Sequence, residues 1–494
     1  MKKSFARKII YGLITCMLIV TADQHTFVDA KATSKDIEAR LEYNRSLPVQ
    51  TATIDNWPVG PTVSAEAAIL MEAGTGAVLY AKNIHEKEYP ASMTKILTAV
   101  LVSENCRLDE IVTFSHDAVF DTPRNSNHIA IDEREQLTVD ECLQGLLVRS
   151  ANEVAFALAE HVGGGNRQAF VDMMNERAAE LGCTDTHFAN PNGLPDENHY
   201  TSCYDMALIG RQFFDNELLC NYSLQRGIHF YPTEHQKDEI IETNITQILP
   251  GKKYGYDDLV GVKTGYTEVA RSCLISCAKR GNMKLICVVM KDESPQQYED
   301  TIALFDYGFS NFDTAVVSEA ETKYNIGGSA ISFGNTDIFG SSKPIISLSK
   351  TDYIVVPKTA EFSDLTSTIS YETDDPGQVA LVNYSYHGEY LGTASVIFLN
   401  SDTEGYEFDK DEEEEKPAKK GPKFVFINVV KIALILAALV FSYFAIRVSY
   451  TLWKKYRETH PNWRREYRKD RRRRPEHTTK KKRKRPNRFR DYDY

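Results

Sequence analysis

The sequence lacks the patterns that mark several common sites and folds. None of its nine cysteines forms a Cys-x-x-Cys pair, so a zinc site of that kind is not expected. The segment His85–Tyr89 lacks the second histidine of a zinc-protease helix. No internal repeat is present, which excludes solenoids and propellers. Long apolar runs are also scarce, and only two stand out, one near each end of the chain.

The apolar run near the start, Ile9–Val20, is too short to span a bilayer comfortably. Basic residues precede it, and Val28-Asp29-Ala30 offers small residues at the positions that a cleavage site requires. Residues 1–30 are therefore predicted to be a secretory signal peptide, with a retained anchor as the alternative. The basic residues are Lys2, Lys3, Arg7 and Lys8.

The second run, Phe424–Val448, is long enough to cross the hydrocarbon core of a membrane. From Lys454 to Tyr494 there are 19 Lys and Arg residues against six Asp and Glu. Because positive charge stays inside, residues 449–494 should be a cytoplasmic tail near anionic lipid, and the residues before 424 should lie outside. A buried core helix would not be flanked by such a tail. Nucleic-acid binding is not expected, since no binding fold is evident.

The residues between these two runs change in pattern along the chain. Residues 31–60 look like a poorly structured lead-in, and residues 61–312 mix helical and strand patterns. Residues 313–400 contain short β-type runs, which predict a separate small β-rich domain. Nine acidic residues fall within 401–423, which is predicted to be a solvated stalk. The expected elements are a hairpin in 65–80, helices in 92–104, 139–162 and 167–181, and strands in 259–290.

The first pattern that suggests chemistry is Ser92-Met93-Thr94-Lys95, at the start of a predicted helix. A serine and a lysine three residues apart share one helix face. A hydroxyl needs a neighbouring base to attack an amide, and a lysine can be that base where burial or a second cation keeps it neutral. Ser347 and Lys350 have the same spacing in the β-rich region, so the pattern alone is a weak signal.

The second pattern is Ser150-Ala151-Asn152. The hydroxyl can relay a proton to a leaving group, and the amide can hold a lysine and the substrate backbone. Both residue types also suit a helix cap, which is the structural alternative. Ser103-Glu104-Asn105 has the same spacing, so this pattern is also weak by itself.

The third pattern is Lys263-Thr264-Gly265-Tyr266, in a predicted strand. Lys263 and Gly265 face the same side, where the cation could bind a substrate carboxylate and the glycine leaves room for a backbone. The backbone N–H groups of Tyr266 and Ser92 could receive an oxyanion, although a surface turn is the alternative. The three patterns in this order are similar to those of penicillin-binding proteins and class A β-lactamases.

Beyond these motifs, the chain resembles the low-molecular-weight penicillin-binding proteins, which are serine-type D-alanyl-D-alanine carboxypeptidases, from about residue 56 to residue 399. The resemblance implies an α/β (α+β) β-lactamase/transpeptidase-like catalytic domain, followed by a small all-β domain, and it implies no cofactor and no metal. The segments that carry it are Asn56-Trp57-Pro58, Tyr89–Lys95, Ala151–His161, Asn190–Leu194 and Asp205–Ala207.

The resemblance also implies a reaction, the removal of terminal D-alanine from a peptidoglycan stem peptide, and covalent inhibition by β-lactam antibiotics. The implied nucleophile, base and proton relay are Ser92, Lys95 and Ser150. The implied substrate-binding residues are Asn152, Lys263, Thr264, Gly265 and Tyr266.

Two positions depart from the family pattern, and two other functions stay open. Gln297 stands where many relatives have a basic residue before an aromatic one, and Arg271 stands where they often have glycine. Arg271 could supply a replacement cation or form a surface salt bridge. One alternative function is a β-lactamase, for which Glu197 is the nearest candidate for the water-activating glutamate. The other is a non-catalytic, membrane-tethered wall-binding or signalling protein, which the tail motivates.

Overall fold

The computed structural model describes residues 34–322, 346–373, 375 and 377–398. The predicted signal peptide, acidic stalk, membrane-spanning segment and basic tail lie outside these residues. Within the described ranges, no helix is both long enough and apolar enough to cross a membrane.

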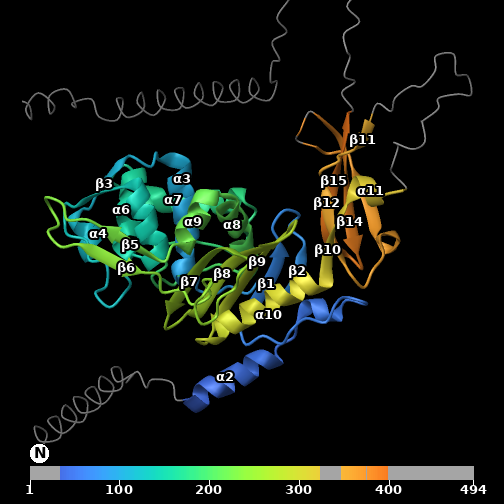
Figure 1. Cartoon of the computed structure of the whole chain (residues 1–494), viewed down its shortest axis with the longest axis horizontal. Coiled ribbons are helices and arrows are strands. Elements are labelled where there is room, and N and C mark those ends of the chain that lie inside the picture. Colours follow the sequence, from blue (N-terminus) through green and yellow to red (C-terminus); the bar gives the residue numbers. More distant parts are fainter. Residues whose placement is uncertain (1–33, 323–345, 374, 376, 399–494) are drawn as a thin grey trace, which may run out of the picture. The chain divides into compact units, whose positions relative to one another are not determined.

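An antiparallel sheet lies at the centre of the part that carries the three motifs (Figure 1), with its five strands in the order β2-β1-β9-β8-β7. Its strands are rich in Val, Ile, Leu and Cys, and they are buried on both faces along most of their length. The strands are β1 (Ala67–Glu72), β2 (Val78–Lys82), β7 (Leu259–Thr267), β8 (Arg271–Arg280) and β9 (Met283–Asp292). The predicted hairpin in 65–80 and the strands in 259–290 are confirmed.

Helices cover this sheet on both faces (Figure 1). The long helix α10 (Gln296–Asn311) packs against β8 and β9, and α8 (Cys203–Asp215) packs against β1 and β9 in a separate core cluster. Behind α8 lies α3 (Lys95–Asn105), whose first eight residues are all buried. The helix α9 (Glu217–Leu224) packs against β7. Both apolar faces of the sheet are therefore removed from water.

A second group of helices packs on α3 and completes the larger core cluster. The predicted helical stretch 139–162 is interrupted, because Ser150 adopts a left-handed conformation with φ of +64°. The group consists of α4 (His116–Phe120), α5 (Val139–Gln144), a π-helical turn η3 (Gly145–Arg149), α6 (Asn152–Val162) and α7 (Arg167–Glu180). Two short strand pairs flank it, β3 (Ile111–Thr113) with β4 (Gln136–Thr138) and β5 (Gly227–Phe230) with β6 (Ile240–Thr243).

The expectation of a poorly structured lead-in is wrong for the residues that the structure describes there. Helix α2 (Ser34–Ser46) is followed by the short turn η1 (Gln50–Thr53). Asn44 is the buried residue of α2, and its amide donates to Ser64 O over 3.0 Å. The Lys82 ammonium donates to Asn44 O over 2.7 Å. Buried polar contacts rather than an apolar face hold this helix, which is why the hydrophobic pattern did not reveal it.

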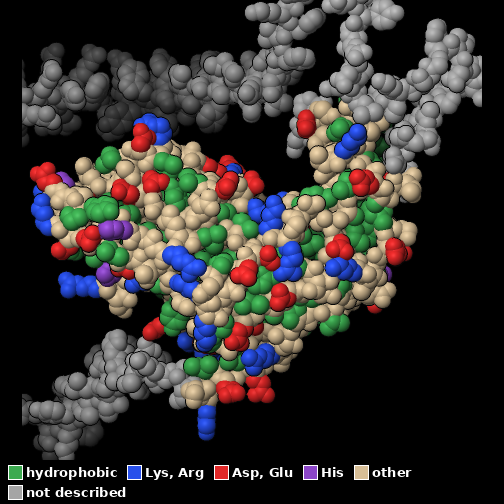
Figure 2. All heavy atoms as spheres, in the orientation of Figure 1, with side chains coloured by type: hydrophobic (Ala, Val, Ile, Leu, Met, Phe, Trp, Pro, Cys, Tyr) green, Lys and Arg blue, Asp and Glu red, His purple; other side chains and the backbone are tan. Residues whose placement is uncertain are grey.

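The chain after α10 forms the short β elements that were predicted for it. Strand β10 (Phe312–Val316) pairs with β12 (Tyr353–Pro357), and a separate sheet has the order β11-β15-β14-β13. This sheet has a small core of its own, which includes Leu348 and Tyr384. Figure 2 shows acidic and basic side chains interspersed over the displayed face. The remaining elements are α11 (Val317–Ala320), β11 (Ile346–Leu348), η4 (Phe362–Asp364), β13 (Thr366–Ser370), β14 (Gln378–Tyr386) and β15 (Glu389–Phe398).

Candidate active site

Ser92 lies in a tight turn, η2 (Ala91–Thr94), directly before α3 rather than within its first α-helical turn. Ala91 has a φ of +47°, which an alanine adopts only where its surroundings enforce it. The Thr94 hydroxyl donates to Ala91 O over 2.9 Å. Gly193 packs so closely that a Cβ there would lie 1.9 Å from the same oxygen. The neighbouring chain therefore fixes the turn that presents Ser92.

Lys95 is fully buried one turn after Ser92, and its Nζ atom has three oxygen neighbours. Ser92 Oγ lies 3.0 Å away and Asn152 Oδ1 lies 2.7 Å away, and the third neighbour is Asn192 O. The two amide oxygens can only accept hydrogen bonds. When the amine is neutral, its two N–H groups donate to these oxygens, and its lone pair is left for the Ser92 hydroxyl.

The surroundings of Lys95 favour this neutral amine. Burial is the main cause that lowers the pKa of Lys95 well below its usual value, and the charge of Lys263 lowers it further. The Glu153 carboxylate acts in the opposite direction. A deprotonated lysine beside a serine hydroxyl can accept the proton of that serine, which is the role of a general base.

Ser150 and Lys263 form a second hydrogen-bonded pair in the same site. Ser150 lies between the π-helical turn and α6, and its Oγ accepts from Lys263 Nζ over 2.9 Å. Lys263 also donates to Thr264 O over 2.8 Å. Burial lowers the pKa of Lys263 to about 7. The three motifs, from the turn before α3, the start of α6 and the strand β7, therefore meet.

Gly265 allows β7 to approach the turn that carries Ser92. A Cβ at this position would lie 3.0 Å from Pro90 O and 3.1 Å from Ser92 N, so a larger residue would push the strand away. The next residue, Tyr266, is exposed, and Thr264 is half-buried. The backbone around Ser92 N thus borders directly on β7.

Comparison with known proteins identifies the family. A family model described as D-alanyl-D-alanine carboxypeptidase matches residues 53–294. The D-alanyl-D-alanine carboxypeptidase DacD of Escherichia coli is 31% identical over 343 residues, which cover 66% of this chain and 85% of that protein. The chain belongs to the D-alanyl-D-alanine carboxypeptidase family. The family assignment confirms the prediction that the chain is a serine-type carboxypeptidase, and therefore an enzyme.

Other members of the family show how much of the chain the likeness covers. DacF of Bacillus subtilis is 35% identical over 258 residues, which cover 51% of this chain and 63% of that protein. The crystal structure of penicillin binding protein 5 from Haemophilus influenzae matches with a TM-score of 0.55 at 26% identity, covering 69% of this chain and 98% of that one. Penicillin binding protein 6B from Escherichia coli matches with a TM-score of 0.52 at 26% identity, covering 70% and 98%. The mixed α/β class that was expected is confirmed.

Several residues of the carboxypeptidase site were not assigned a role from the sequence. His199 is buried, and Ala189 N–H donates to its Nδ1 over 3.0 Å, so the ring proton is on Nε2 and is donated to Thr94 Oγ1 over 2.8 Å. Burial lowers the pKa of His199 to about 3, so the ring stays neutral. Asn192 and Glu153 were also missed. The only signal for Asn192 was its place in the family-like segment Asn190–Leu194.

The two positions that depart from the family pattern lie in different elements, β8 and α10. Arg271 begins β8 opposite Thr267, and its Nε lies 4.0 Å from Glu293 Oε1. Gln297 is buried in the first turn of α10, and its backbone carbonyl oxygen accepts a hydrogen bond from the Thr301 hydroxyl. Arg271 thus has an acidic partner, whereas Gln297 is packed inside the protein.

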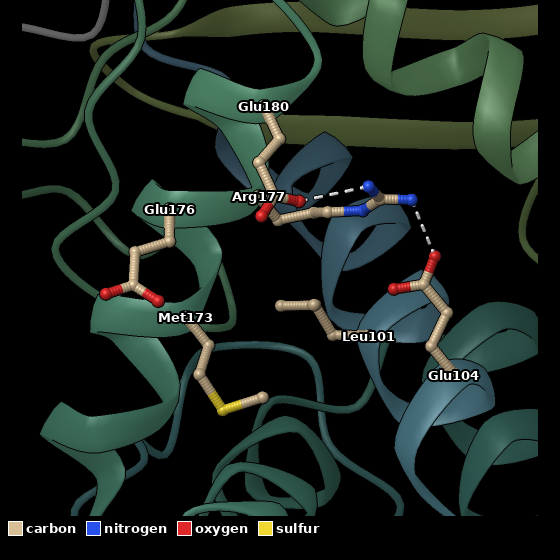
Figure 3. Close-up of a pocket in the computed structure, with 6 residues that line it drawn as sticks. All are labelled: Leu101, Glu104, Met173, Glu176, Arg177 and Glu180. Carbon is tan, nitrogen blue, oxygen red and sulfur yellow. Dashed lines mark hydrogen bonds and ion pairs between the residues drawn. The ribbon is translucent and has the colours of Figure 1, made fainter. Parts of the chain in front are cut away.

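A hollow of about 310 Å³ lies elsewhere, between α3 and α7 (Figure 3). Arg177 bridges Glu104 over 2.9 Å and Glu180 over 3.1 Å within it. Arg177 thus forms ion pairs with both glutamates. No residue of the three motifs lines the hollow. The three motifs, rather than this hollow, therefore define the candidate site. The hollow is lined by Leu101, Glu104, Met173, Glu176, Arg177 and Glu180.

Proposed function

We propose that this chain removes the terminal D-alanine from peptidoglycan stem peptides through an acyl-enzyme on Ser92. The observation that carries the proposal is the surroundings of Lys95, in which two acceptor oxygens occupy the N–H groups of the neutral amine. The lone pair then lies 3.0 Å from the Ser92 hydroxyl. A serine in this position is activated without a histidine or a metal ion.

The first step is acylation of Ser92. Lys95 takes the hydroxyl proton as Oγ bonds to the carbonyl carbon of the D-Ala–D-Ala peptide bond. The backbone N–H groups of Ser92 and Tyr266 stabilise the negative oxygen, and one such donor contributes about 3 kcal/mol in comparable enzymes. When the C–N bond breaks, the leaving nitrogen takes a proton from Ser150, whose Oγ accepts a hydrogen bond from Lys263 over 2.9 Å. The proton that Lys95 took from Ser92 is returned to Ser150, so Lys95 is neutral again before the second step. Free D-alanine then departs.

The second step is hydrolysis of the ester on Ser92. A water molecule loses a proton to Lys95 and bonds to the carbonyl carbon, and the bond to Oγ breaks as Oγ regains a proton. Asn152 keeps Lys95 in place in both steps, since its Oδ1 accepts over 2.7 Å. The enzyme returns to its starting protonation state, so one water is consumed for each D-alanine released.

Substrate selection depends on the free carboxylate at the end of the stem peptide. Lys263 and Thr264 bind this group, and the bound negative charge favours the protonated form of Lys263. Penicillins present a similar amide and carboxylate, so they acylate Ser92 and act as inhibitors. The family includes solved structures described as penicillin binding proteins, which supports this assignment.

We further propose that the catalytic part lies outside the cell membrane. The support is in the sequence, where Phe424–Val448 is apolar over a sufficient length and is followed by the basic tail. The chain would cross the bilayer once, with residues 449–494 in the cytoplasm near anionic lipid. A protease added to intact cells should then remove the catalytic part and leave the tail protected.

The test of the activity uses the full chain and a peptide ending in L-Lys-D-Ala-D-Ala, with release of D-alanine as the readout. Ser92→Ala should lower release by roughly four orders of magnitude. The matched control is Ser347→Ala, which removes the serine of another Ser-x-x-Lys spacing and should leave the rate unchanged. No release from a wild-type chain that forms a lasting penicillin adduct would refute the substrate. Rapid turnover of the penicillin adduct would indicate a β-lactamase instead.

A further inference from the structure

A cluster of three different side chains lies at the far end of the helices that carry the active-site residues. Cys106, Glu110 and His161 place a sulfur, a carboxylate oxygen and a ring nitrogen within 4.8 Å of one another, and all three are half-buried. Cys106 is the C-cap residue that directly follows α3, and His161 lies in the last turn of α6. These helices begin at Lys95 and Asn152, about 15 Å away by the rise of an α-helix.

This set of donor atoms fits one class of ion. Thiolate and imidazole are ligands that zinc and similar transition metals prefer, whereas calcium and magnesium require mostly oxygen. Three protein ligands leave one position of a tetrahedral ion for water. Two helix C-termini also meet here, and each carries partial negative charge that favours a cation.

The hydrogen bonds already present orient the ligands. Glu110 Oε1 accepts from the Arg107 backbone N–H over 2.9 Å, which leaves Oε2 directed at His161 Nε2 over 3.1 Å. The guanidinium of Arg107 lies 3.9 Å from Oε1 and pairs with Asp109 over 3.0 Å. The positive charge of Arg107 therefore pairs with Asp109 and lies near Glu110 Oε1, whereas the other oxygen, Oε2, is the one near His161.

We propose that Cys106, Glu110 and His161 bind one zinc-like divalent ion that joins the C-terminal ends of α3 and α6. Binding releases the thiol proton to solvent, and the neutral imidazole coordinates through Nε2. The ion is remote from Ser92 and takes no part in the reaction. It holds together the far ends of two helices whose near ends are joined by the hydrogen bond between Lys95 and Asn152. This site departs from the expectation that the chain binds no metal.

The experiment titrates the full, metal-free chain with Co²⁺, because a cobalt–thiolate bond gives a near-ultraviolet charge-transfer band. One equivalent should produce the band, and Zn²⁺ should abolish it by displacement. Cys106→Ser should lose the band, and His161→Gln should weaken binding. The matched control is Cys183→Ser, which removes the other half-buried cysteine of the described residues and should keep the band.

Thermal unfolding gives a second readout. Zn²⁺ should raise the melting temperature of the wild type and of Cys183→Ser, but not that of Cys106→Ser, and circular dichroism would show that each variant is folded. A band that survives in Cys106→Ser would overturn the proposal. Displacement of cobalt by Mg²⁺ or Ca²⁺ would also overturn it, since an oxygen-dominated site would then be present.

Discussion

Two Ser-x-x-Lys segments, one beginning at Ser92 and the other at Ser347, have different surroundings in the structure. Ser92 lies in a tight turn and Lys95 is fully buried at the start of α3, with its Nζ 3.0 Å from the serine oxygen. Ser347 lies in the short strand β11, and Lys350 follows it as an exposed side chain. The spacing brings the two groups together only where the backbone turns, and burial then makes the lysine a base.

The spacing Ser-x-Asn shows the same contrast. Ser103 Oγ donates to Val100 O over 2.8 Å, and the Asn105 amide donates to Leu101 O over 2.8 Å, so both side chains bond to their own helix. Ser150 and Asn152 instead contact Lys263 and Lys95. The difference comes from the left-handed backbone of Ser150, which interrupts the helix and directs the motif into the site.

The largest contrast is expected when methionine replaces the lysine of each of these two Ser-x-x-Lys segments. Lys95→Met removes the base but keeps the length of the side chain, so acylation by a fluorescent penicillin should slow by roughly 10³-fold. Lys350→Met changes an exposed side chain and should leave the acylation rate unchanged. The measurement is the rate of adduct formation under single-turnover conditions.

Folding must be checked before a slow rate is assigned to the lost base. Lys95 lies inside the larger core, so the melting temperature of Lys95→Met should be compared with that of the wild type. A variant that folds and still acylates at the wild-type rate would show that Lys95 is not the base.

The sequence predicted the family, the three motifs and most elements of the central sheet, because these depend on local spacing and on alternation of buried residues. The motif residues singled out in the sequence are in contact in the structure, Lys95 with Asn152 and Lys263 with Ser150. The roles proposed for them are tested by the variants described here. The signal peptide and the membrane anchor stay predictions, since they fall outside the described residues.

Other features depend on contacts that no local pattern contains. Asn192 reaches Lys95 through a backbone carbonyl, which any residue type could supply, so the side chain gave no signal. His199 acts on Thr94 across 105 positions of sequence. Helix α2 is held by the buried Lys82, whose pKa is lowered to about 8 by burial. Such contacts follow from tertiary packing, and a single sequence does not show them.

A moderate effect is expected from the asparagines of the two Ser-x-Asn copies. Asn152→Ala removes an acceptor from Lys95 and leaves one of its buried N–H groups without a partner, so D-alanine release should fall by roughly 10²-fold. Asn105→Ala removes a bond at the end of α3 and should change only stability, by about 1 kcal/mol or less. The measurement is kcat/KM for both, with chemical denaturation for Asn105→Ala. Equal loss of activity in the two variants would contradict the assignment.

The smallest effect on the reaction is expected from substitution of Glu153. This buried carboxylate influences the pKa of Lys95. Ionised Glu153 favours the charged form of Lys95, against the effects of burial and Lys263. Glu153→Gln removes this charge, while its Oε1 can still accept from Ile129 N–H as the carboxylate does over 2.7 Å. The pKa of Lys95 should therefore fall, and the neutral base should be present at lower pH.

The acidic limb of the pH profile for penicillin acylation should move to lower pH in Glu153→Gln. Glu160→Gln is the matched control, because Glu160 lies two turns further along α6 and pairs with Arg167 over 2.7 Å. Its pH profile should match that of the wild type. If the acidic limb instead moves to higher pH in Glu153→Gln, Glu153 assists the deprotonation of Lys95. Burial and the charge of Lys263 would then not be sufficient to make Lys95 a base.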